Sequence, residues 1–122
     1  MFKVYRYEHP TERKGPYNCT FRGLKDDSVC SALHENHANE KHPSCTIDGL
    51  DFIQSSDGFL SACQNMRLLK KWFHSYNKRL LNSGFVIAEY TVKAKFDGQS
   101  GLQCVFHESA VIERKEFSSF PE

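Results

Sequence analysis

Five metal-ligating side chains lie close together in this sequence. They follow the pattern C-x3-H-x2-H-x4-H-x2-C and comprise Cys30, His34, His37, His42 and Cys45. A helix over residues 29–38 would place the first three on one face, because residues three and four apart are neighbours on a helix. Thiolate and imidazole groups suit a tetrahedral Zn²⁺ shell, so zinc is one prediction. The alternative, which we favour because the sequence has no CxxC pair, is a polar helix with surface histidines and a loop cysteine.

A second candidate site is a basic segment between Gly58 and Ala88, which has no acidic residue. The segment carries five Lys and Arg residues, so its formal charge is +5; the other eleven basic and fifteen acidic residues leave −4 elsewhere. The exposed face of a helix here would present Arg67, Lys70, Lys71, His74 and Lys78. Such a face can steer an acidic protein or a nucleic acid toward it. The alternative is a solvated helix face, and the absence of interleaved aromatic residues argues against stacking on single strands.

A third candidate lies near the N-terminus, where Arg6, His9 and Tyr17 would clamp an anionic ligand. An arginine guanidinium matches the geometry of phosphate and carboxylate groups. Arg6 and Glu8 share a predicted strand face with apolar Val4, and charged side chains are rarely buried unless they are paired. Either this face opens to a cleft or the strand end is exposed; we favour the exposed strand end.

The cysteine content indicates reduced thiols. Five cysteines are an odd number and widely scattered, whereas secreted disulfide scaffolds more often have an even number. The N-terminal residues lack the apolar core of a secretory signal, and no apolar run reaches the roughly 18 residues of a membrane span. We therefore expect a cytoplasmic protein with no membrane partner, in which Cys63 and Cys104 serve as packing residues.

Helical segments are predicted from capping residues and apolar spacing. Asp26, Asp27 and Ser28 supply N-cap chemistry for the helix over 29–38. Asn65 caps a helix over 65–76 whose apolar stripe consists of Leu68, Leu69, Trp72, Phe73 and Tyr76. A further helical turn over 78–81 ends near Gly84, which suits the left-handed position after a helix.

Strands are predicted from alternation with a period of two. Residues 2–8 form one strand, and residues 85–96 form a second with one buried and one wet face. The buried face would comprise Val86, Ala88, Tyr90, Val92, Ala94 and Phe96. Residues 97–101 have turn composition, so 102–107 would return as a hairpin strand, and 108–117 would add a helical turn or an edge strand.

This order of elements predicts an α+β fold: a mainly antiparallel sheet with two to three helices packed on one face. The 122 residues are enough for one domain with its own core, and residues 118–122 would form a frayed tail. No complete catalytic signature occurs, so we lean against an enzyme and expect no cofactor other than the zinc considered above.

Several sequence segments resemble a family of small, mostly uncharacterised proteins from tailed bacteriophages. They are VYRYEHP with GPY, HPS with Asp48, CQNMRLLKKWF, LLNSGFVIAEYTV and GLQCVFHESAVI. The resemblance implies an accessory protein that binds and inhibits a host enzyme or a defence complex. It makes a host or defence protein the expected partner, with nucleic acid as the alternative.

A fainter similarity connects the chain to ADP-ribosyltransferase folds, through an arginine on the first strand (Arg6) and a late strand. Those enzymes use a late glutamate, near the place that Gln103 occupies here. An amide cannot act as a carboxylate toward a developing oxocarbenium ion. A small ADP-ribosyltransferase-like enzyme is therefore the alternative function, and a zinc-stabilised or nucleic-acid-binding module is a third.

Overall fold

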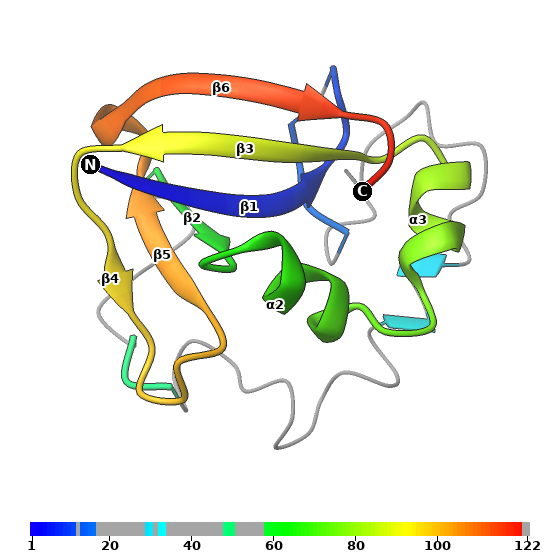
Figure 1. Ribbon diagram of the computed structural model, residues 1–122, viewed down its shortest axis with the longest axis horizontal. Helices are drawn as coiled ribbons and strands as arrows, with labels where there is room; N and C mark the ends of the chain where they lie inside the picture. The colour runs from blue at the N-terminus through cyan, green and yellow to red at the C-terminus, as the bar shows by residue number, and fades with distance from the viewer. Residues whose placement is uncertain (12, 17–28, 31, 34–47, 51–57, 121–122) are drawn as a thin grey trace.

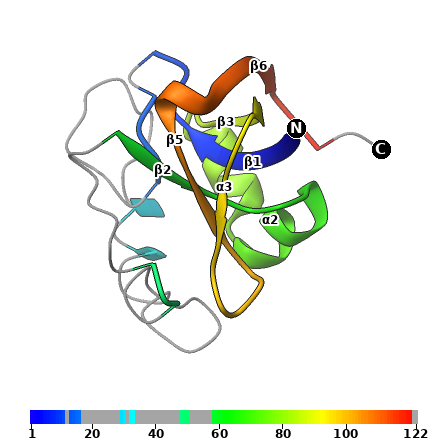
Figure 2. The same cartoon turned by 90° about the vertical axis from the view of Figure 1, so that its left-hand side faces the viewer.

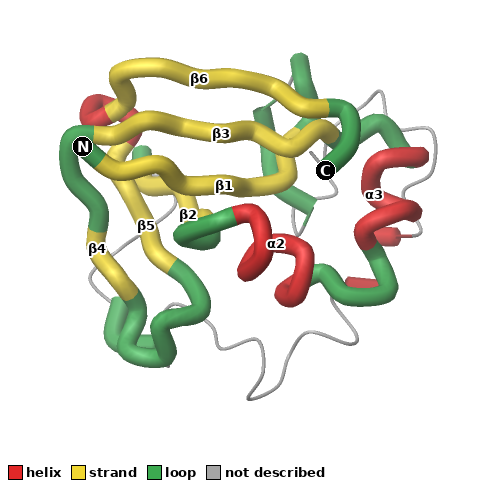
Figure 3. The backbone as a smooth tube through the Cα atoms, viewed as in Figure 1, coloured by secondary structure: helices red, strands yellow, loops and turns green. Residues whose placement is uncertain are grey.

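The computed structural model describes residues 1–11, 13–16, 29–30, 32–33, 48–50 and 58–120. Within them the chain forms two antiparallel three-stranded sheets and two α-helices (Figures 1 and 3). The α+β class and the mainly antiparallel pairing are thus confirmed. Residues 29–30 and 32–33 are helical, as predicted, but the rest of the 29–38 prediction lies outside the described residues. The number of helices and their packing on one face stay predictions.

The first sheet contains β1 (Phe2–Glu8), β3 (Val86–Val92) and β6 (Val111–Phe117) in the order β1-β3-β6. The central strand β3 pairs antiparallel with both neighbours, and its registers place Val4 opposite Tyr90 and Tyr90 opposite Arg114. Because side chains at paired positions point to the same face, residues from all three strands converge there. The strand predicted over 2–8 and the edge strand within 108–117 are confirmed.

The second sheet contains β2 (Phe59–Ala62), β5 (Cys104–His107) and β4 (Phe96–Asp97) in the order β2-β5-β4. Its strands run at a steep angle to those of the first sheet (Figures 1 and 2). Tyr5 and Cys63 join the two sheets: Tyr5 N donates to Cys63 O at 2.8 Å, and Cys63 N donates to Tyr5 O at 2.7 Å. We had not predicted β2 from the sequence. The strand begins shortly after residues 51–57, which lie outside the described part of the chain.

The first sheet is covered on both faces, so the core has two parts. One face carries Tyr7 and Ile87, which pack with Leu69 of α2 (Met66–Trp72) and Leu80 of α3 (Asn77–Asn82). The opposite face meets the second sheet, and its cluster comprises Val4, Ala62, Ala88, Tyr90, Val92, Cys104 and Phe106. Because Ile87 is fully buried, the prediction of a wet face on its strand is wrong at this end.

The helix predicted over 65–76 ends earlier than expected, at Trp72. Its start is correct, since the Asn65 side chain accepts a hydrogen bond from Leu68 N at 2.8 Å. The chain then reaches Ser75, whose φ of 75° lies in the left-handed region and cannot continue a helix. The Asn77 side chain secures the break, because it donates to Lys70 O at 2.9 Å and accepts from Tyr7 Oη at 2.6 Å. The helical turn predicted separately over 78–81 is confirmed as α3, which spans Asn77–Asn82. The two helices are visible as separate red coils in Figure 3.

The strand predicted over 85–96 is also too long. The β3–β6 register becomes irregular between Thr91 and Val92, and Lys93 N donates instead to Ala110 O at 2.9 Å. The chain therefore leaves the first sheet, and Phe96 enters β4 of the second with 46% of its surface exposed. The expected position of Phe96 on the buried face of a single strand is wrong for this reason.

The predicted turn between β4 and β5 is confirmed, and a buried carboxylate holds it. Asp48 accepts hydrogen bonds from Ser100 N at 2.6 Å, Ser100 Oγ at 2.9 Å and Gln103 Nε2 at 3.0 Å. A Cβ atom at Gly98 would lie 2.0 Å from Asp48 Oδ2, so only glycine fits beside this carboxylate. Asp48 thus supplies the turn with acceptors that its backbone alone lacks.

The two core cysteines generate a prediction about pH. Burial raises the pKa of Cys63 and of Cys104 from 9.0 to about 12. In the native protein both thiols stay protonated at pH 8.5, so we expect iodoacetamide to spare them there and to alkylate them in urea, as measured by peptide mass spectrometry. Since these thiols ionise more readily when unfolded, their contribution to stability is complete below about pH 8.5 and is lost as the pH rises toward 12. Rapid native alkylation of Cys63 or Cys104 at pH 8.5 would contradict this.

Candidate functional site

A buried carboxylate lies at the end of β1. Glu8 has no exposed surface, yet it is an acidic residue on the face where the two sheets meet. An isolated buried carboxylate would be strongly destabilising. The prediction that charged residues on β1 mark an exposed strand end is therefore wrong, because Glu8 is neutralised inside the fold by partners from other strands.

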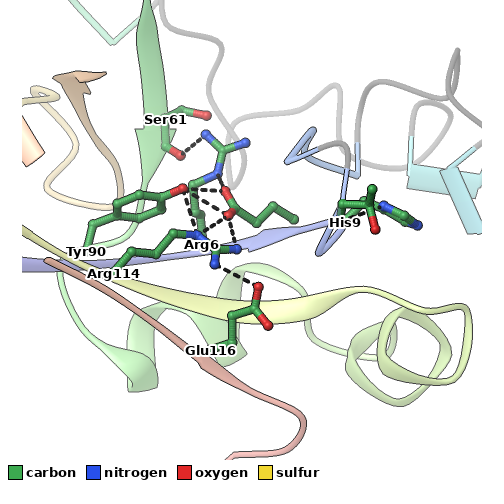
Figure 4. A network of polar contacts seen from close by, with 8 residues as sticks. Arg6, His9, Ser61, Tyr90, Arg114 and Glu116 are labelled. Atoms are coloured by element: carbon green, nitrogen blue, oxygen red, sulfur yellow. Dashed lines mark hydrogen bonds and ion pairs between the residues drawn. The ribbon is translucent and has the colours of Figure 1, made fainter. Parts of the chain in front are cut away.

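Those partners are two arginines and a tyrosine (Figure 4). Tyr90 Oη donates to both carboxylate oxygens of Glu8 at 2.9 Å, and Arg114 donates from Nε at 2.7 Å and also from Nη2. Arg6 Nε lies 3.1 Å from Glu8 Oε2, close enough for an ion pair but without hydrogen-bond alignment. Arg114 also pairs with Glu116 at 2.7 Å. Two cations and two carboxylates thus balance, and Glu116 sits at the exposed rim.

The electrostatic environment is consistent with this balance. Burial lowers the pKa of Arg6, although the Glu8 carboxylate opposes the shift. Burial also acts to lower the pKa of Arg114, but hydrogen bonds to Glu116 and Glu8 outweigh it and raise that pKa. Burial and the nearby Glu8 charge raise the pKa of Tyr90. Arginine side chains stay protonated in proteins, and the raised pKa of Tyr90 favours its neutral phenol, so this group holds charge in place rather than exchanging protons.

A cavity of about 680 Å³ opens beside Arg6. Its described walls come from β1, β2, α2 and residues 13–16, and they include Tyr5, Arg6, Arg13, Phe59, Ser61 and Trp72. Arg6 Nη1 donates to Ser61 O at 3.3 Å, which fixes the guanidinium between the two sheets. The prediction of Arg6 as a clamp residue thus gains a cavity next to it.

The other two clamp residues are not brought to this cavity by the described structure. His9 is 92% buried and organises a turn, since its Nδ1 accepts from Thr11 N at 3.2 Å and its backbone N donates to Lys14 O at 2.9 Å. Tyr17 lies outside the described residues. Sequence reasoning missed Arg13 and Lys14, for which the only signal was a basic pair before Gly15-Pro16.

The basic segment contributes exposed side chains from α2, α3 and the turn between them. We call this surface the basic face; it consists of Arg67, Lys70, Lys71, His74 and Lys78, all of which are exposed. Within the described residues, none of the five forms an ion pair. The ammonium of Lys70 lies 5.5 Å from the centre of the Phe120 ring, and Arg79 lies 6.0 Å from that of Tyr76. Phe120, expected in a frayed tail, thus packs beneath this surface.

Most of the predicted metal ligands cannot be placed. His34, His37, His42 and Cys45 lie outside the described residues. Cys30 is fully buried and packs in the core beside Tyr7 and Leu33. In the described part of the chain, no group of three metal-ligating side chains comes together. Zinc binding stays a prediction, and so does the absence of a cofactor.

Gln103, at the place where an ADP-ribosyltransferase would need its glutamate, has a structural contact. Its side-chain amide donates to Asp48 at 3.0 Å and so supports the β4–β5 turn. Gln103 also lines the cavity.

No helix among the described residues has the length and apolar character needed to span a membrane.

Comparison with known proteins identifies a phage family. The model of the family described as "Bacteriophage T4 Y00F protein" matches residues 1–119 of this chain. No curated protein and no solved structure matches this chain.

The buried network generates a prediction about stability. Replacing Glu8 with Gln removes one charge, leaves the buried Arg6 without its counter-ion and leaves the half-buried Arg114 with Glu116 alone. We expect Glu8→Gln to lower the free energy of unfolding by about 3–5 kcal/mol, as measured by urea denaturation. Glu116→Gln is the matched control, because Glu116 pairs with the same arginine, Arg114, but is itself exposed. Its loss of unfolding free energy should stay below about 1 kcal/mol. Equal losses for the two variants would contradict the role assigned to Glu8.

Proposed function

The chain belongs to the bacteriophage T4 Y00F protein family and is a small phage accessory protein, and we propose that it acts by binding an acidic surface of a host or defence protein. The observation that carries the proposal is the basic face. Five exposed cationic or titratable side chains come from two short helices and the turn between them, and no acidic residue interrupts the sequence between Gly58 and Ala88.

The charge distribution favours a binding role for this surface. The remainder of the chain has a formal charge of −4 beside the +5 segment, so charge is unevenly distributed along the sequence although the net charge is only +1. Opposite charge on a partner speeds encounter and fixes orientation. Cations already paired within the chain would contribute less, but those of the basic face have no acidic partner in the described structure.

A protein partner fits better than a nucleic acid. The rings of Tyr76 and Phe120 are half-buried at the basic face and lie next to Arg79 and Lys70. Aromatic and arginine side chains are enriched at protein interfaces, whereas stacking on single-stranded nucleic acid needs rings that are open on one side. The two helices have only seven and six residues, a short span for reading a groove.

We predict that removing the basic face weakens partner capture. The test variant carries Arg67→Gln, Lys70→Gln and Lys71→Gln, which retain helix-forming side chains. Immobilised protein is incubated with bacterial host lysate, and the captured partner is identified by mass spectrometry and then titrated as a purified protein. Loss of three interfacial charges should reduce affinity about 100-fold, and wild-type affinity should fall steeply as salt rises.

The matched control carries Lys3→Gln, Lys93→Gln and Lys115→Gln, three exposed lysines of the same charge away from the basic face. It should bind the partner as the wild type does. The proposal fails if both triple variants bind equally well, or if nuclease treatment of the lysate abolishes capture. The latter outcome would assign the basic face to nucleic acid.

A further inference from the structure

We propose that the cavity beside Arg6 is a binding site for a small molecule that combines a phosphate group with an aromatic ring. The cavity lies between β1, β2, α2 and residues 13–16, whereas the basic face points to solvent from the exposed side of the helices. None of its five residues lines the cavity. The inference is therefore independent of the function proposed above.

The cavity has the size and composition of a ligand site. Its volume of about 680 Å³ falls within the roughly 300–1,000 Å³ of small-molecule pockets. Aromatic side chains form much of the described wall: Tyr5, Tyr7, Phe59, Trp72 and Phe73. Tyr7 and Phe73 are already buried, whereas Tyr5, Phe59 and Trp72 are half-buried. A planar apolar group would stack on these half-buried rings and remove them further from water.

The charged part of the wall is entirely cationic among the described residues. Arg6, Arg13 and Lys14 line the cavity, and no Asp or Glu does. The nearest carboxylate of the buried network, Glu8, is shared between Arg6 and Arg114, and Arg114 also pairs with Glu116, so that network is balanced. Arg13 and Lys14, which have no acidic partner among the described residues, add positive charge to the wall. A phosphate offers three oxygens and up to two charges, which matches three cations better than a carboxylate does.

Arg6 is already fixed in a position to receive an oxygen. Its Nε faces Glu8 at 3.1 Å and its Nη1 donates to Ser61 O at 3.3 Å. The remaining nitrogen, Nη2, has no hydrogen-bond acceptor within the described residues. It lies 3.1 Å from where a Cβ atom of Gly15 would be, and Gly15 is part of the cavity wall. Glycine at this position leaves open the space next to this donor.

Arg13 is held at the cavity by a strained turn. Its φ of 56° is in the left-handed region, which non-glycine residues rarely adopt. A hydrogen bond from Arg13 N to His9 O at 2.7 Å and one from His9 N to Lys14 O at 2.9 Å close the turn. Backbone strain of this kind concentrates at ligand clamps, and glycine would fit the turn with less strain.

Titration of the full chain with defined probes tests the proposal. The probes are adenosine monophosphate, phosphotyrosine, adenosine and inorganic phosphate, followed by calorimetry and by NMR shifts of Gly15 and the Trp72 indole. At least one of the two aromatic phosphates should bind at least about tenfold more tightly than adenosine and inorganic phosphate do. An aromatic phosphate places a ring against the aromatic part of the wall and a phosphate against the cationic part, whereas the other two probes use one part each. The tighter of the two identifies the source of the phosphate, nucleotide or phosphorylated phenol.

Two variants separate ligand binding from folding. Arg13→Gly removes a cation and relieves backbone strain, so it should weaken binding about tenfold without lowering stability. Gly15→Ala fills the space beside Arg6 Nη2 and should also weaken binding about tenfold. Lys115→Gln, which removes an exposed charge on β6, is the control and should bind as the wild type does. Absence of binding by both aromatic phosphates at millimolar concentration, equal binding of adenosine, or unchanged affinity of both cavity variants would overturn the proposal.

Discussion

The fold depends on one buried carboxylate. Glu8 lies where β1, β3 and β6 present their inner face to the second sheet, and it has no exposed surface. Tyr90 comes to it from β3 and Arg114 from β6, while Arg6 on the same strand links the group to Ser61 of β2. Since a buried charge is tolerated only when its partners surround it, the network requires all four strands to adopt one arrangement.

This constraint places the two candidate surfaces. Arg6 can border a cavity only because Glu8 and Ser61 hold its guanidinium on two sides, which leaves one nitrogen toward Gly15. On the other face of the first sheet, Tyr7 and Ile87 pack against Leu69 and Leu80. That packing turns the polar sides of α2 and α3 outward, so the cationic side chains form a surface for a partner.

Local features were predictable from the sequence, and long-range ones were not. The Asn65 cap and the glycine at position 84 with its φ of 109° each depend on neighbouring residues. The turn after Asp97 has a local composition signal, but Asp48, which is 52 residues from Ser100, also holds it. The helix break at Ser75 depends on Tyr7, which is 70 residues from its partner Asn77. The pairing of Glu8 with Arg114 spans 106 residues, so an acidic residue on a strand was interpreted as exposed.

A double-mutant cycle on Glu8 and Arg114 tests the central claim most directly. Glu8→Gln, Arg114→Met and the double variant are compared by urea denaturation, which isolates the interaction between the two side chains. If the buried pair organises the strands, the double variant should be more stable than the sum of the single losses predicts, by about 1.5–3 kcal/mol. Additive losses, with a coupling energy near zero, would contradict the account.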